Sequence, residues 1–200
     1  MKHYLRLVIH CSLFVTIFMF TRTICTAQVK VNVEINRNPS EPNLLIYSKQ
    51  RPLTLEDFKG QADDMSKSVV ANTTTSLEIG RSSETVNNKV TLNVTLGIYF
   101  DKNKSWCKPE GHSKSTLAHE QIHFDIAVLK ACELYNKIKS YSFSAANYGK
   151  ELDLLHKKAQ IDTKQEQDDY DNETSHGTIP TEQKKWSDKI KQQIATQSCF

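Results

Sequence analysis

Apolar and polar residues alternate without interruption from residue 90 to residue 100. The apolar positions of this segment are Val90, Leu92, Val94, Leu96, Ile98 and Phe100. Because successive side chains of a strand point to opposite faces, the pattern predicts a β-strand with one buried face. Residues 69–79, rich in Val and Thr, predict a second strand, and the polar residues 81–89 predict the loop of a hairpin. A further short strand is predicted at residues 44–47, and capping-box spacing at residues 54–57 predicts a helical turn.

Three helical stretches follow the strands. Residues 113–140 contain neither Pro nor Gly, and Ser113 and Ser115 are both possible N-caps. Apolar residues recur there at helical spacing, at Ala118, Ile122, Ala127, Ala131, Leu134 and Ile138. A second helix is predicted at residues 144–169, and a third begins after Pro180. The third carries an apolar stripe, formed by Trp186, Ile190 and Ile194. Strands followed by helices indicate an α+β fold.

The N-terminal segment has the pattern of an export signal. Lys2 and Arg6 are followed by an apolar run at residues 7–20, and small residues at 25–27 offer a cleavage site. We therefore predict a signal peptide at residues 1–27 and an exported protein, periplasmic or extracellular. The apolar run is too short to span a bilayer, so no stable membrane insertion is expected after cleavage.

The rest of the chain is predicted to be a lead-in at residues 28–42, either a tether or an edge strand, and one domain at residues 43–200. Cleavage would lower the 26 basic residues to 23, which equals the 23 acidic ones. A nucleic-acid-binding protein needs a basic footprint, so this balance argues against nucleic acid as a partner. The 173 residues left of the 200 suit a single domain with a proper core.

Three cysteines remain after the predicted cleavage: Cys107, Cys132 and Cys199. In an oxidising compartment two of them could pair and leave one over. The sequence does not choose among the three pairings.

The segment that indicates chemistry is His119-Glu120-Gln121-Ile122-His123, an HExxH pattern inside the first predicted helix. Residues four apart lie on one helix face, so the two imidazoles can reach a single ion. Glu120 is close enough to activate a water molecule on that ion. An accidental match in a chain of this composition has odds of roughly one in seventy. The pattern therefore predicts a zinc site, and helical geometry turns Asp125 away from the histidine face.

A catalytic zinc site needs a third protein ligand and leaves the fourth position to water. His176 is favoured as this ligand. It lies in the polar segment at residues 170–177, which is predicted to be a loop, and ligating groups tend to lie in loops. His156, in the second predicted helix, is the alternative histidine. Downstream carboxylates also stay open as third ligands: Glu151, Asp153, Asp171 and Glu173.

With these motifs the chain resembles a bacterial family, a domain of unknown function described as predicted secreted zinc-dependent proteases. The likeness spans residues 44–194 and rests on residues 52–60, Ser105-Trp106, residues 119–125 and a downstream YDxxTxHG pattern. The downstream residues of the likeness are Tyr170, Asp171, Thr174, His176, Gly177, Gln183 and Trp186. The resemblance implies a zincin-like fold, in which a small antiparallel sheet precedes the metal-binding helix and two further helices. It also supports His176 as the third ligand.

Together these features predict a secreted zinc endopeptidase acting on peptide or protein substrates. One Zn²⁺ ion on His119, His123 and His176 would lower the pKa of water from ~15.7 toward ~7, and Glu120 would act as general base. Tyr170 is the candidate donor to the oxyanion. The substrate is expected to add a strand to an edge of the predicted hairpin.

Two other functions stay open. The first is a binding or structural protein of the cell envelope, stabilised by zinc without turnover. The second is hydrolysis of cell-wall peptide amides, which the same chemistry allows. The sequence does not identify the natural substrate or the oligomeric state.

Overall fold

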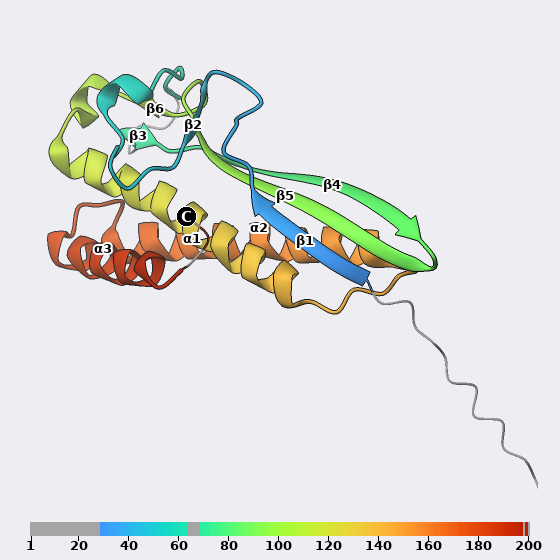
Figure 1. Ribbon diagram of the computed structural model, residues 1–200. Helices are drawn as coiled ribbons and strands as arrows, with labels where there is room; N and C mark the ends of the chain where they lie inside the picture. Colours follow the sequence, from blue (N-terminus) through green and yellow to red (C-terminus); the bar gives the residue numbers. More distant parts are fainter. Residues whose placement is uncertain (1–28, 64–68, 198, 200) are drawn as a thin grey trace, which may run out of the picture.

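A mixed four-stranded sheet packs against a group of three helices (Figure 1). The computed structural model describes residues 29–63, 69–197 and 199. The central strand is β5 (Lys89–Asp101). It pairs with β4 (Thr75–Val86) on one side, and on the other with β1 (Val29–Ile35) and β2 (Leu44–Ile46). The arrangement confirms the α+β class, but the sheet is mixed and not antiparallel as predicted, because β1 runs parallel to β5. The predicted signal peptide at residues 1–27 lies outside the described residues.

The three helices follow the strands, as predicted. The remaining elements are β3 (Ala71–Asn72), β6 (Trp106–Cys107), α1 (Lys114–Ser140), α2 (Tyr148–Thr174) and α3 (Pro180–Ala195), with 3₁₀ turns at Leu55–Asp57 and Pro109–Gly111. The strand predicted at residues 69–79 is divided between β3 and β4, and β6 was not predicted. β3 and β6 form a separate two-stranded sheet. No helix among the described residues has the length and apolar character needed to cross a membrane.

The hairpin differs from its prediction at the turn. The polar residues 81–89 were predicted to be a loop, but β4 continues to Val86 and pairs there with Lys89. The turn itself is Asn87–Asn88, with φ of 49° and 60°. Asn is among the residues that tolerate this left-handed region, so two residues are enough to reverse the chain. The polar side chains of residues 81–86 are exposed, which explains why hydrophobicity gave no sign of the strand.

The lead-in contains an edge strand. β1 runs parallel to β5, from the Val29–Val90 pair to the Ile35–Leu96 pair. Parallel strands need a long connection, and here the chain returns through β2, β3 and β4 before it reaches β5. Residues 29–35 therefore belong to the same sheet as the predicted domain.

Helix α1 lies between the sheet and the other two helices. Its buried Leu134 and Ile138 pack against Leu92 and Leu96 of β5. On another side, its Ile122, Ile126 and Leu129 pack against one residue of α2 and three of α3, namely Tyr170, Trp186, Ile190 and Ile194. Because apolar contacts surround α1, the residues of the HExxH pattern are held on a rigid element.

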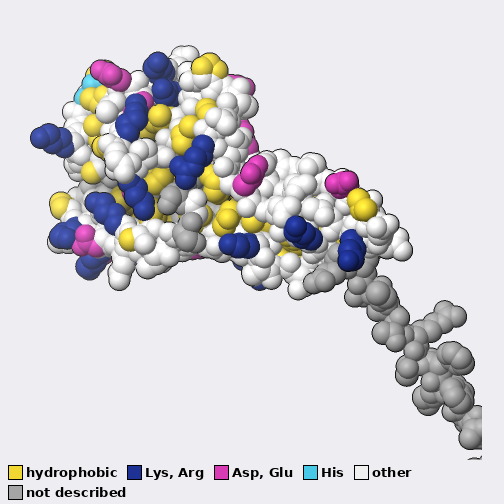
Figure 2. Space-filling view, viewed as in Figure 1, with side chains coloured by type: hydrophobic (Ala, Val, Ile, Leu, Met, Phe, Trp, Pro, Cys, Tyr) yellow, Lys and Arg dark blue, Asp and Glu magenta, His cyan; other side chains and the backbone are white. Residues whose placement is uncertain are grey.

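Charges of both signs lie on the outer face of the molecule. Figure 2 shows Lys and Arg side chains over the wider end, with Asp and Glu side chains among them. This distribution fits the near balance of basic and acidic residues in the sequence.

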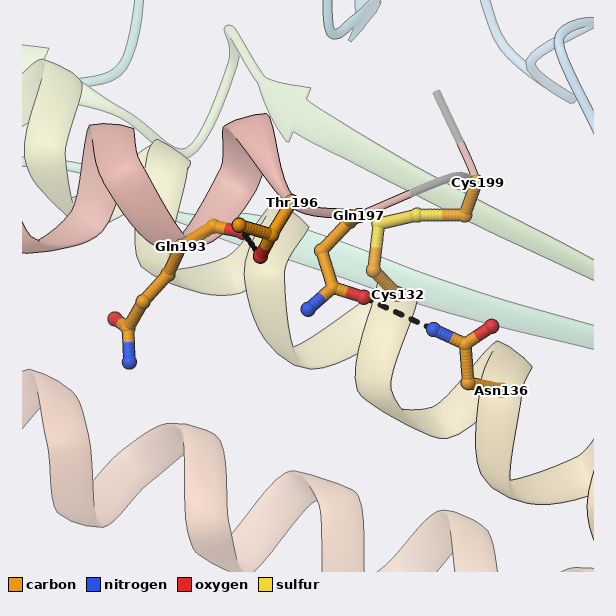
Figure 3. Close-up of a disulfide and its surroundings, with 6 residues drawn as sticks. All are labelled: Cys132, Asn136, Gln193, Thr196, Gln197 and Cys199. Carbon is orange, nitrogen blue, oxygen red and sulfur yellow. Dashed lines mark hydrogen bonds between the residues drawn. A yellow bond between two sulfur atoms is a disulfide. The ribbon is translucent and has the colours of Figure 1, made fainter.

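The structure selects one of the three cysteine pairings. Cys132, fully buried in α1, is bonded to Cys199 beyond the end of α3 (Figure 3). Cys107 is a free cysteine. Beside the bridge, Asn136 donates a hydrogen bond of 2.9 Å to Gln197. The disulfide therefore joins the C-terminal segment to the helix that carries the HExxH pattern.

Removing this disulfide is expected to lower the free energy of unfolding by about 2 to 4 kcal/mol. The bridge closes a loop of 67 residues that contains α2 and α3, and the chain entropy of so long a loop is large. The measurement is urea unfolding of a variant carrying Cys132→Ala and Cys199→Ala, in the presence of a chelator so that metal binding does not contribute. Cys107→Ala is the matched control, with an expected change below about 1 kcal/mol. Equal losses in the two variants would contradict the role of the bridge.

Candidate metal centre

His119 and His123 lie on one face of α1 and point at α2. Ser113 begins the helix as predicted, since its Oγ accepts a hydrogen bond of 3.0 Å from the backbone N–H of Thr116. The two Nε2 atoms are 3.1 Å apart, and each lies 3.0 Å from Oδ1 of Asp171. Ligands about 2.0 Å from a tetrahedral zinc ion lie about 3.3 Å from one another. Three potential ligand atoms therefore converge at nearly the spacing of a zinc site.

Asp171 reaches the histidines because α2 is longer than predicted. Residues 170–174 were predicted to be loop, but they form the last turns of α2, which ends at Thr174. Tyr170 and Thr174 are fully buried there, and the Thr174 hydroxyl donates a hydrogen bond of 2.7 Å to the Tyr170 carbonyl. Packing of these two residues places the intervening Asp171 over the histidine face of α1.

Two glutamine side chains fix the orientation of the imidazoles. Nδ1 of His119 lies 3.1 Å from Oε1 of Gln183 in α3. Nδ1 of His123 contacts Oε1 of Gln167 in α2, whose Nε2 donates a hydrogen bond of 2.8 Å to the His123 carbonyl. An amide oxygen only accepts, so each Nδ1 carries the proton and each Nε2 presents a lone pair. This is the tautomer that a metal ion requires.

A positive charge stabilises the three acceptor atoms of His119, His123 and Asp171, which lie close together. Burial alone raises the pKa of Asp171, but its contacts with His119 and His123 outweigh burial and hold that pKa well below its usual range. Burial lowers the pKa of His123, but Asp171 and the charge of Glu120 outweigh burial and leave that pKa raised. Both directions mean that a cation is stabilised at the cluster. A proton on the His123 ring supplies this charge at low pH, and a metal ion can supply it at neutral pH.

Glu120 presents an unpartnered oxygen beside these atoms. Its side chain is buried, and Oε2 has no hydrogen-bond partner among the described residues. It lines a cavity of about 710 Å³ together with His119, His123 and Asp171. Burying a carboxylate oxygen without a partner costs free energy, so its presence here indicates a ligand, such as water on the ion.

Tyr170 supports His119 rather than facing the cavity. Its hydroxyl donates to the carbonyl of His119 at 3.2 Å and to Oε1 of Gln183 at 2.8 Å. Its ring stacks on the His119 ring with the centroids 4.6 Å apart, and burial raises its pKa far above the usual range. Tyr170 therefore contacts His119 and Gln183 and is not among the residues that line the cavity, so its oxyanion contact stays a prediction.

His176 lies at the rim of the cavity, in a left-handed turn. Ser175, His176 and Gly177 have φ of 46°, 53° and 80°. The His176 side chain is 62% exposed, and its Nδ1 is 3.5 Å from Oδ1 of Asp171. Gly177 lies against His119, where an added Cβ would be 2.9 Å from Nδ1. The turn therefore places His176 beside the cluster, in which Asp171 is the third potential ligand, and His176 as a ligand stays a prediction.

The other open ligands lie elsewhere. Among the described residues, the one group of three potential ligands within 4.8 Å of one another is His119, His123 and Asp171. Glu173 accepts a hydrogen bond from Trp186, Asp153 pairs with Arg81, and Glu151 accepts from the backbone of Ser144. His156 does not line the cavity.

Replacing Gln183 by leucine is expected to weaken metal affinity about 10- to 100-fold, because His119 loses the acceptor that fixes its tautomer. Gln193→Leu, in the same helix, is the matched control, since Oε1 of Gln193 has no hydrogen-bond partner within the described ranges and Gln193 does not line the metal cavity. Competition with a metal-sensitive dye measures both affinities. A similar loss in both variants would assign the effect to α3 packing and not to the hydrogen bond.

The comparisons with known proteins agree with the resemblance to a bacterial family of unknown function. No curated protein and no solved structure matches the chain. Residues 57–177 match a family described as "Bacterial protein of unknown function (DUF922)". The match includes the HExxH pattern, Asp171 and the His176-Gly177 turn, whereas β1, β2 and α3 lie outside it. Because the match covers more than half of the 200 residues, the chain belongs to this family of bacterial proteins of unknown function.

Proposed function

We propose that the chain is an exported, zinc-dependent endopeptidase with a zincin-like arrangement. His119, His123 and Asp171 are the proposed ligands, and Glu120 is the proposed general base. The observation that carries the proposal is the unpartnered Oε2 of Glu120, buried in the same cavity as the three converging ligand atoms. A site that only stabilises the fold needs no such carboxylate.

The proposed reaction divides its work among these residues. A bound zinc ion would act as a Lewis acid, which would polarise the scissile carbonyl and lower the pKa of the attacking water. Glu120 accepts the proton of the attacking water and then delivers it to the leaving amine. Gln167 and Gln183 keep the histidine rings in place, and Tyr170 holds the His119 ring from its other face.

The walls of the cavity fit an extended peptide. Residues 69–73, which include β3, line one side, and β3 is held to α1 because the Thr73 hydroxyl donates to the Glu120 carbonyl at 3.3 Å. Among the described residues, β3 pairs with β6 alone, so its backbone offers a place for strand addition. The proposed substrate strand therefore lies along β3 and not along the β4–β5 hairpin, which was the expectation from sequence.

The lining also favours internal peptide bonds. Among the described residues that form the cavity, none is Lys or Arg, so no side chain there would pair with the terminal carboxylate of a substrate. Small apolar and hydroxyl side chains dominate the wall instead, including Val70, Ala71, Thr116 and Thr178. Peptides of proteins or of the cell wall both satisfy this description.

One observation favours a second candidate function. His176 lies 3.5 Å from Oδ1 of Asp171 and could become a fourth ligand. Four protein ligands close a zinc site and make it structural. The chain would then be a zinc-stabilised binding protein of the cell envelope.

Zinc stoichiometry and hydrolysis, measured on the same preparation, test the proposal. We expect one zinc ion per chain and cleavage of a mixture of internally quenched peptides, lost with a chelator and restored by added zinc. Blocking both ends of the peptides should leave cleavage intact, because the proposed enzyme is an endopeptidase. One bound zinc ion without cleavage of any peptide in the mixture would favour the structural candidate.

A further inference from the structure

A second cavity lies on the other side of α1 from the candidate metal centre. Its volume is about 400 Å³, and its wall combines the segment after β2, α1 and the C-terminal end of α3. The side chains that form it include Tyr47, Lys49, Gln121, Asp125, Lys191 and Ile194. Gln121 and Asp125 each follow a histidine of the metal cluster by two residues, which is about 200° around a helix. The two cavities therefore open on opposite faces of α1.

Asp125 is a buried carboxylate that forms no ion pair among the described residues. It is 5% exposed, and Lys191, which lines the same cavity, acts on it only through its charge. Its Oδ1 accepts a hydrogen bond of 2.8 Å from Nε2 of Gln121. Oε1 of the same amide accepts from the backbone N–H of Leu53 at 2.7 Å, which fixes the direction of the amide. The carboxylate is thus held in one orientation at the wall of the cavity.

The other buried acids of the described chain have an explanation that Asp125 lacks. Asp57 pairs with Arg51 at 2.7 Å, and Asp101 pairs with Lys104 at 3.3 Å. Glu120 faces the proposed metal ion. An unpaired buried carboxylate is costly, and a cavity beside it gives a cationic ligand room to offset that cost.

We propose that this second cavity binds a primary ammonium group carried on a short apolar body, with Asp125 as its counter-ion. The ring of Tyr47 and the side chains of Pro52 and Ile194 supply apolar walls for that body. An aromatic ring beside the charge also favours a cation. The volume suits a group of side-chain size.

The same side chains disfavour other ligands. Gln121 turns its NH₂ group, not its oxygen, toward Asp125, so the pair does not offer a metal ion two oxygen ligands. Asp125 also lies outside the described group of three potential metal ligands. The carboxylate would repel an anion, whereas an ammonium group would form an ion pair with it.

Charge at Asp125 is required for this binding. Burial raises its pKa to about 6, although Gln121 and the positive charge of Lys191 oppose the rise. Tyr47, Lys49 and Lys191 are the other ionisable side chains of the cavity wall, and burial raises the pKa of Tyr47 to about 12.

Titration of the zinc-loaded full chain with benzylammonium chloride, followed by amide NMR at pH 7.5, tests the proposal. Saturable shifts are expected at the amides of Lys49, Gln121 and Ala195, and benzyl alcohol should bind at least about tenfold more weakly because it has the same body without the charge. An acetylated pentapeptide with one central lysine, titrated in parallel, distinguishes a lysine side chain from a free amine as the source.

Three variants make the outcome decisive. Asp125→Asn should lower the affinity for benzylammonium at least about tenfold without changing the affinity for benzyl alcohol. Lys191→Met should raise the affinity for benzylammonium a few-fold, because it removes a competing cation. Asp153→Asn, at an exposed acid paired with Arg81, should change nothing. If Asp125→Asn fails to fold, the Lys191→Met and benzyl alcohol results still decide. Equal affinity for the two ligands, no saturable binding, or full affinity in Asp125→Asn would overturn the proposal.

Discussion

Replacing Glu120 by glutamine is expected to lower the rate of peptide hydrolysis about 10²- to 10⁴-fold while zinc remains bound. Glutamine has the shape of glutamate but cannot accept the proton of water at neutral pH. The ligand atoms of His119, His123 and Asp171 are unaffected, so the metal content should stay at one ion per chain. The measurements are kcat on an internally quenched peptide and zinc analysis of the same sample.

A second readout separates chemistry from folding. Oε2 of Glu120 is buried without a partner, so loss of its charge should leave the free energy of unfolding unchanged or raise it. Glu133→Gln is the matched control, because Glu133 is a half-exposed residue of the same helix that pairs with Lys130. Full hydrolysis by Glu120→Gln would discard the general-base mechanism, and loss of zinc would show that Glu120 is itself a ligand.

The elements with strong local patterns were predicted well. The alternation of β5 appears as buried Leu92, Val94 and Leu96, and α1 spans the interval without Pro or Gly that follows its Ser113 cap. Towards the end of β5 the prediction of a single buried face is wrong, because Gly97 and Tyr99 of the other face are buried as well. The capping spacing at residues 54–57 is confirmed, since the Thr54 backbone donates to Asp57 at 2.9 Å. In each case the information lies within a few residues of the element, where spacing and capping act.

Features that depend on contacts between distant parts of the chain could not be predicted from the sequence. The polar part of β4 is a strand because β5 pairs with it, and the end of α2 is helical because Tyr170 and Thr174 pack on α1. Neither segment shows amphipathic periodicity of its own. The choice of Cys132 and Cys199 for the disulfide has the same cause, because pairing depends on the position of the C-terminal segment in space.

The candidate metal site shows where the sequence is sufficient and where it is not. Spacing of four residues on a helix predicted that His119 and His123 converge. Asp171 lies 52 residues from His119 and was one of several open carboxylates, so only the packing of α2 on α1 could select it. Gln167 and Gln183 were not identified as partners of the rings, because the sequence does not show which of many glutamines faces an imidazole.

Replacing Asp171 by asparagine is expected to weaken zinc affinity more than about 100-fold, whereas His176→Asn should leave the affinity nearly unchanged. Asp171 supplies the charged oxygen 3.0 Å from both imidazole nitrogens, but His176 lies outside this cluster. Asn suits position 176 because it tolerates the left-handed conformation, where φ is 53°. Competition with a metal-sensitive dye gives both affinities and ranks the two candidate third ligands directly.

The same pair of variants has a thermal readout. Zinc at 100 times its dissociation constant stabilises the folded chain by about 2.7 kcal/mol, so a 100-fold loss of affinity removes most of that stabilisation. The zinc-dependent rise in Tm should therefore persist in His176→Asn and nearly vanish in Asp171→Asn. Asp169→Asn, at a partly exposed acid two residues away on α2, controls for a change of charge near the site. A loss of the rise in both variants would make His176 a ligand as well, which would close the site and favour the structural function over hydrolysis.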